Sequence, residues 1–118
     1  MSQRKITTPG PLLDKQGKLI ETGYATSLVK TYNREQIAAS KLRIKEWDYY
    51  LITSDCFALA LTIADNGYMS MDSISFMWFE GAKGSNTQSR IEPFPMGKRN
   101  LPVSSAQGDV SVSGKGWQ

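Results

Sequence analysis

The chain contains no histidine and only one cysteine, and these absences exclude several kinds of chemistry within it. Ser-His-Asp and Cys-His nucleophile systems both need a histidine base. Zinc and copper sites most often use histidine, and Cys56 with scattered carboxylates offers no convincing ligand set. We therefore expect no metal and no other cofactor, and any acid–base chemistry must use Asp, Glu, Tyr or Lys. No catalytic set is recognisable.

The sequence also lacks a long apolar run, and we expect no secretory signal. The longest run, from Cys56 to Ala64, is interrupted by Thr62 and is too short to span a bilayer as a helix. The polar start, Met1 to Lys5, is not followed by the apolar core of a secretory signal. We therefore expect no membrane span. Because Cys56 has no second cysteine with which to pair, we also expect a cytoplasmic protein.

An excess of charge of one sign is missing as well. Fourteen Lys and Arg oppose 11 Asp and Glu, which gives a formal net charge of +3. Proteins that bind nucleic acid usually concentrate basic residues on one face, so nucleic acid is a weak candidate partner. The 118 residues are enough to bury a core without disulfides or metals.

Residues 1–32 are expected to form an irregular segment. Pro9-Gly10-Pro11 is incompatible with the interior of a helix or of a central strand. Asp14 to Lys18 predicts a turn with Gly17 at positive φ, between two short extended pieces.

A short helix is predicted over residues 33–41. Asn33 is a suitable N-cap, and Gln36 occupies the position of its capping-box partner. Glu35 lies in the first turn, where it favours the positive end of the helix dipole.

The strongest pattern predicts a three-stranded antiparallel meander over residues 42–79. The first strand has no purely apolar face, which predicts either a bulge or a half-solvated position near Glu46. In the second strand bulky side chains alternate with small ones, and the third strand continues the alternation with Ile74, Phe76 and Trp78. Asn66-Gly67 between them predicts a hairpin. The bulky and the small residues of the second strand are Phe57, Leu59, Leu61 and Ile63, and Ala58, Ala60, Thr62 and Ala64.

Residues 80–107 are expected to form a loop, because Pro93, Pro95 and Pro102 interrupt any long element. Residues 108–118 are interpreted as the start of a further strand. The fold class is thus all-β, mainly an antiparallel meander, with one short N-terminal helix. We expect residues 1–118 to form a single β-rich domain, the truncated N-terminal half of a longer protein.

Four blocks of sequence carry a resemblance to a known family. They are Gly10-Pro11-Leu12-Leu13-Asp14, Gly23-Tyr24-Ala25-Thr26-Ser27-Leu28-Val29, Arg43-Ile44-Lys45-Glu46-Trp47-Asp48-Tyr49-Tyr50 and Ala60-Leu61-Thr62-Ile63-Ala64-Asp65-Asn66. The chain resembles the opening of the DUF2804 proteins over residues 9–79, and residues 108–116 continue the likeness.

That family is uncharacterised and is similar to a lipocalin-like group that includes carotenoid hydratases and the AttH proteins. The resemblance implies a longer chain of two β-barrel-like halves, so this sequence would be a lipocalin-like half-barrel whose partner is the missing C-terminal half of its own chain. The resemblance does not identify a reaction, because proteins that share a fold often differ in function.

The candidate ligand-binding residues are Arg43, Glu46, Trp47, Asp48 and Tyr50. The two aromatic residues offer flat apolar area with a polar edge, and Arg43 offers a fork of donors to a carboxylate or carbonyl. A buried acid here could donate a proton. The competing interpretation is a solvated strand face with paired charges.

For the other residues that could carry a function, we favour a purely structural role. Cys56 is expected to be a small packed side chain, and Lys98 and Arg99 are expected to lie in a solvated loop. Asp65 is expected to serve the hairpin that follows it.

Three functions are compatible with these observations. The leading hypothesis is binding of a small, largely apolar ligand in a β-barrel cavity. The alternative is part of a hydratase or isomerase acting on an unsaturated lipid. Asp48, or a C-terminal carboxylate outside this sequence, would be the proton donor, and Tyr49 or Tyr50 would orient the substrate. The third is binding of single-stranded nucleic acid, which needs aromatic and basic side chains on one face.

Overall fold

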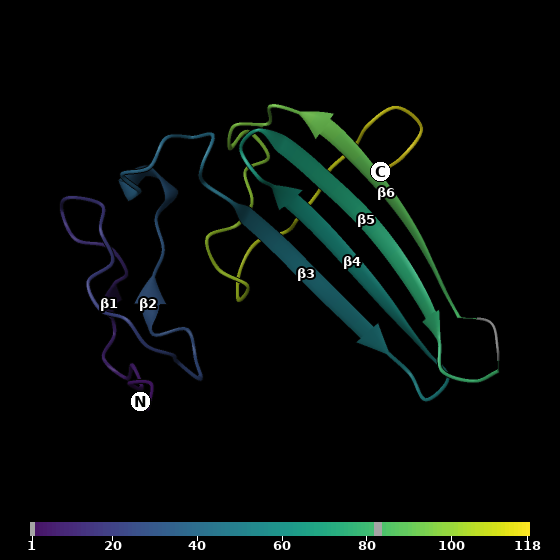
Figure 1. Cartoon of the computed structure of the whole chain (residues 1–118), viewed down its shortest axis with the longest axis horizontal. Helices are drawn as coiled ribbons and strands as arrows, with labels where there is room; N and C mark the ends of the chain where they lie inside the picture. Colours follow the sequence, from purple (N-terminus) through teal and green to yellow (C-terminus); the bar gives the residue numbers. More distant parts are fainter. Residues whose placement is uncertain (1, 82–83) are drawn as a thin grey trace. The chain divides into compact units, whose positions relative to one another are not determined.

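The computed structural model describes residues 2–81 and 84–118 (Figure 1). They form two compact units. The first comprises Met1–Ala39 and Pro102–Asp109, and the second comprises Ser40–Leu101 and Val110–Gln118.

The first unit is largely irregular, as predicted for residues 1–32. Its regular part is a parallel pair of two-residue strands, β1 (Gly10–Pro11) and β2 (Lys30–Thr31). Glu21 joins distant parts of this segment, because its carboxylate lies 2.6 Å from Lys30 Nζ and 3.3 Å from Arg4 Nη2. The hydrogen bond from Lys30 holds the pKa of Glu21 below its usual range.

The predicted turn at Asp14 is confirmed. Asp14 Oδ1 accepts hydrogen bonds from the N–H groups of Gln16 and Lys18, both at 2.9 Å. Gly17 adopts a φ of 73°, and a Cβ there would come within 2.3 Å of the Gln36 carbonyl oxygen. This position therefore requires glycine for its backbone conformation and for the close approach.

The predicted helix over residues 33–41 is wrong. The structure has only a 3-10 turn, η1 (Arg34–Gln36), capped by a 3.0 Å hydrogen bond from the Glu35 N–H to Asn33 Oδ1. The next residue, Ile37, is already extended, at φ −73° and ψ 122°. The cap was identified correctly, but η1 buries no residue. Without packing, the hydrogen bonds of a first helical turn do not offset the conformational entropy lost in forming it.

The second unit contains a four-stranded antiparallel sheet in the order β3-β4-β5-β6 (Figure 1). The strands are β3 (Glu46–Thr53), β4 (Phe57–Asp65), β5 (Met69–Trp78) and β6 (Ser85–Pro93). The first three confirm the meander. The first of them begins at Glu46 rather than residue 42. It pairs continuously with β4, so there is no bulge, and Glu46 is the half-buried position that was the other expectation.

The loop assigned to residues 80–107 is corrected by β6, which pairs along its full length with β5. Its sequence is mostly polar and every residue is exposed, so it lacks the alternation that reveals a half-buried strand. The strand start expected within residues 108–118 is also wrong: this segment forms an isolated bridge between Gly114 and Trp117 instead. Residues 82 and 83, within the loop prediction, lie outside the described residues.

The strand register gives the sheet two unlike faces. The bulky face carries the large side chains predicted to share it, together with Tyr50 and Ile52 of β3. Phe76 contacts the rings of Phe57 and Trp78, with centroid distances of 5.1 and 4.6 Å. On the opposite, alanine face, Ala58, Ala60 and Ala64 are only 3–7% exposed. These three alanines are the most buried side chains of the alanine face, and cross-strand neighbours flank each of them on both sides.

The hairpin between β4 and β5 is held by a buried carboxylate. Asp65 is 1% exposed and accepts hydrogen bonds from the N–H groups of Gly67 at 2.9 Å and Gly97 at 2.7 Å. The backbone N–H groups of Phe94 and Met96 bond to the same hairpin. Both residues have positive φ, 52° and 55°, an unfavourable conformation that these bonds help to hold.

We predict that Asp65→Ala lowers the free energy of unfolding by about 3 kcal/mol, since it leaves two buried N–H groups without an acceptor. All three tryptophans lie in the second unit, so urea unfolding followed by their fluorescence reports on it. The matched control is Asp55→Ala, in an exposed turn, which should change the free energy of unfolding by less than about 0.5 kcal/mol. Equal effects would contradict the role given to Asp65.

Candidate functional site

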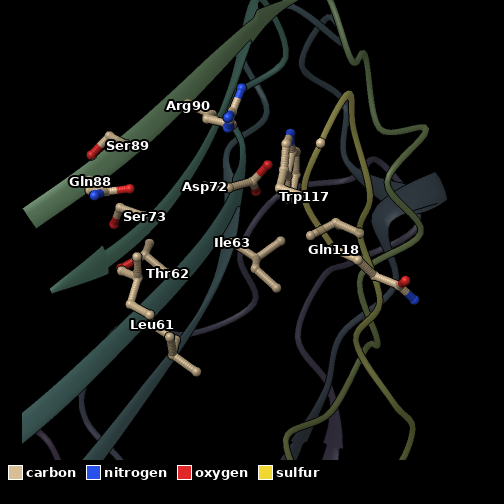
Figure 2. Close-up of a pocket in the computed structure, with 13 residues that line it drawn as sticks. Leu61, Thr62, Ile63, Asp72, Ser73, Gln88, Ser89, Arg90, Trp117 and Gln118 are labelled. Atoms are coloured by element: carbon tan, nitrogen blue, oxygen red, sulfur yellow. The ribbon is translucent and has the colours of Figure 1, made fainter.

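An open pocket of about 700 Å³ lies on the bulky face of the sheet, beneath the C-terminal segment (Figure 2). All of its lining residues belong to the second unit. They are Leu61, Thr62, Ile63, Asp72, Ser73, Ile74, Gln88, Ser89, Arg90, Val112, Gly116, Trp117 and Gln118.

Two adjacent cross-strand rows form the floor of the pocket. One row contains Leu61, Ile74 and Gln88, and the next contains Ile63, Asp72 and Arg90. Thr62, Ser73 and Ser89 form the row between them, and their side chains belong to the alanine face because strand residues alternate. The floor is therefore apolar on β4 and becomes polar toward β6.

The C-terminal segment supplies the opposite wall. A bridge between Gly114 and Trp117 closes a tight turn, with a 3.1 Å hydrogen bond from the Gly114 N–H to the Trp117 carbonyl. A Cβ at Gly114 would come within 2.3 Å of Trp117 Nε1, so only glycine leaves room for the indole. This contact places a half-buried aromatic ring beside the pocket.

The polar end of the pocket contains a buried ion pair. Asp72 Oδ1 and Oδ2 accept hydrogen bonds from Nη1 and Nη2 of Arg99, the second at 2.7 Å. The two side chains are only 11% and 10% exposed. This bidentate geometry joins β5 to the loop after β6 and corrects the expectation of a solvated Arg99.

The five candidate residues do not form one cluster. Arg43 is exposed in a turn before β3, and Trp47 is 64% exposed on the alanine face. Glu46, Asp48 and Tyr50 lie on the opposite, bulky face. Tyr50 extends the Leu61–Ile74–Gln88 row, and Asp48 extends the Ile63–Asp72–Arg90 row.

None of these five residues lines the pocket, although Asp48 and Tyr50 occupy the adjoining strand. Asp48 is half-buried, and its Oδ2 atom has no hydrogen-bond partner among residues 2–81 and 84–118. Their role as ligand-binding residues remains a prediction.

Sequence reasoning missed Asp72 and Trp117, which line the pocket, and Arg99, which binds Asp72. Asp72 was detectable, because it falls in phase with the bulky residues of β5, where a carboxylate needs a partner. No local pattern identifies Arg99 as that partner, 27 residues away. Nor does one place Trp117 over the sheet. Cys56, expected to be packed, is exposed in the turn before β4.

Two structural features are absent from the described part of the chain. No helix there has the length and apolar character needed to cross a membrane. No group of three or more acidic or cysteine side chains there is arranged to hold a metal ion.

Comparisons with known proteins gave one match. A family model described as "Domain of unknown function (DUF2804)" matches residues 3–118, which is nearly the whole chain and includes the blocks that suggested the resemblance. Neither the curated proteins nor the solved structures gave a match.

We predict that Arg99→Met lowers the free energy of unfolding by about 3 kcal/mol, because it leaves the Asp72 carboxylate buried without its bidentate partner. The double variant Asp72→Leu/Arg99→Met should cost less than Arg99→Met alone, since no buried charge is then left unpaired. Urea unfolding followed by tryptophan fluorescence measures both.

The control for this pair is Arg43→Met, which removes an exposed guanidinium in the same unit and should have little effect. A double variant at least as unstable as Arg99→Met would show that the ion pair does not determine stability here.

Proposed function

We propose that this chain, which belongs to the DUF2804 family, binds a small, largely apolar ligand on the bulky face of its sheet. The observation that carries the proposal is the open pocket under the C-terminal segment, with an apolar floor and a few polar groups at one end. Small-molecule sites commonly combine these two features.

The apolar surface of the pocket is available to a ligand. Ile74 is 46% exposed, and Leu61, Ile63 and Trp117 are only half-buried. Covering such side chains with an apolar molecule removes them from water, which stabilises the complex by about 25 cal/mol per Å². The ligand is then held chiefly by burial of apolar area.

We further propose that the sheet is part of a lipocalin-like half-barrel. Its support is the connectivity, since each strand of β3-β4-β5-β6 pairs with its neighbours in sequence, as in up-and-down barrels. In such a barrel the bulky face would line the interior. Asp48 and Tyr50 would then extend the wall of the cavity beyond the pocket.

The alternative function, a hydratase acting on an unsaturated lipid, is favoured by one observation. The Oδ2 atom of Asp48 is buried without a hydrogen-bond partner among the described residues, on the same face as the pocket. As an acid, Asp48 would give its proton to one alkene carbon. A water oxygen would bond to the other carbon, and a proton from that water would return to Asp48. Incubation with oleate tests this, because a product heavier by one water must form and must be lost in Asp48→Asn.

We do not propose nucleic-acid binding. Trp47 and Tyr49 lie on the alanine face, where the residues of β3, β4, β5 and β6 carry no charge. Lys45, just before β3, lies over the Tyr68 ring, 5.6 Å from its centroid. Stacking platforms for single strands need basic side chains beside their aromatic residues.

We predict saturable binding of the neutral apolar dye N-phenyl-1-naphthylamine, measured by its fluorescence. Ile74→Gln should weaken this binding about tenfold, because it replaces apolar contact area in the pocket with an amide. The exposed position of Ile74 means that the fold tolerates the change.

The matched control is Leu51→Gln. Leu51 is also an exposed aliphatic residue, 53% against 46% for Ile74, but it lies on the alanine face. An equal loss of affinity in both variants, or the absence of saturable binding, would refute the proposed site.

A further inference from the structure

The charges at the polar end of the pocket do not balance. Asp72 is the one acid among the pocket-lining residues, and both of its oxygens accept hydrogen bonds from Arg99. The carboxylate and this guanidinium neutralise each other. The second guanidinium, that of Arg90, leaves one positive charge in excess.

Arg90 is placed beside this pair by the strand register. It is the direct cross-strand neighbour of Asp72, on the same face, and Figure 2 shows the two side chains together, with Leu61 at the other end of the pocket. Arg90 is exposed and makes no ion pair or hydrogen bond within the described part of the chain. Its donors are therefore open to a molecule in the pocket.

Four other acids share the bulky face, but none of them satisfies Arg90. Glu46 and Asp65 lie in the next row, on β3 and β4, and do not line the pocket, and Asp65 already accepts hydrogen bonds from Gly67 and Gly97. Glu92 is two residues further along β6 and does not line the pocket. Asp48 is at the far end of the row, three strand spacings or about 14 Å away.

Resting on the proposed function, we infer that the ligand is an amphipathic monocarboxylate whose carboxylate binds Arg90 and whose apolar body lies over Leu61, Ile63 and Ile74. A guanidinium matches a carboxylate through two parallel hydrogen bonds. A singly charged head group fits an excess of one positive charge, whereas a phosphate monoester dianion does not. Trp117, on the opposite wall, covers the apolar body.

The test displaces N-phenyl-1-naphthylamine with decanoate, 1-decanol or decyl phosphate. In the unmodified protein decanoate should bind at least tenfold more tightly than decanol, and more tightly than decyl phosphate. Arg90→Gln should weaken decanoate binding about tenfold, because it removes the charge-assisted hydrogen bonds to the carboxylate. It should leave decanol binding unchanged, because decanol has no carboxylate. Arg90→Lys, which keeps the charge but not the fork of donors, should be intermediate.

The matched control is Lys98→Gln, which removes the same charge from an exposed turn in the same unit and should leave decanoate binding unchanged. Equal affinities for decanoate and decanol, an equal loss in Lys98→Gln, or tighter binding of decyl phosphate would overturn the carboxylate assignment alone. If neither the dye nor any of the three ten-carbon compounds binds, the proposed function fails as well. Circular dichroism of Arg90→Gln confirms that the exposed substitution leaves the sheet folded.

Discussion

The register between β4 and β5 is the constraint on which the rest of the second unit depends. Because side chains alternate along a strand, a slip by one residue would exchange the bulky and alanine faces. The Asp65 carboxylate opposes such a slip by binding the hairpin at Gly67 and the loop after β6 at Gly97. One buried acid therefore fixes the start of β5 and the end of β6, which meet at the same end of the sheet, in relation to β4.

The pocket is a direct consequence of this register. It aligns Ile63, Asp72 and Arg90 in one row, which sets an apolar residue beside an acid and a base on three successive strands. It also brings Asp72 within reach of Arg99, in the same loop that Asp65 anchors. The loop after β6 thus contributes both to the stability of the sheet, through Gly97, and to the charge balance at Asp72, through Arg99.

The two edge strands of the sheet, β3 and β6, differ in polarity. β6 is polar and ends in Pro93, features that discourage pairing with another strand. β3 carries exposed Trp47, Leu51 and Ile52, with Glu46 and Asp48 as its charged residues. The strand part of the Arg43–Tyr50 block divides between the two faces of the sheet, with Trp47 and Tyr49 on the alanine face and Asp48 and Tyr50 on the bulky face.

The sequence by itself determined the features that depend on neighbouring residues. Alternation identified the meander and the members of its two faces, Asn66-Gly67 identified the hairpin, and Asn33 identified a cap. The family was recognised from blocks of this kind, and the match over residues 3–118 confirms it. Only the tertiary structure decided the rest, because it depends on contacts between distant residues. A polar edge strand such as β6 is specified by its partner β5 rather than by its own pattern. The helix after Asn33 failed for lack of packing, and the pocket depends on Trp117, which comes to the sheet from a segment whose sequence gives no sign of that contact. The neutralisation of Asp72 likewise depends on Arg99, which is 27 residues away.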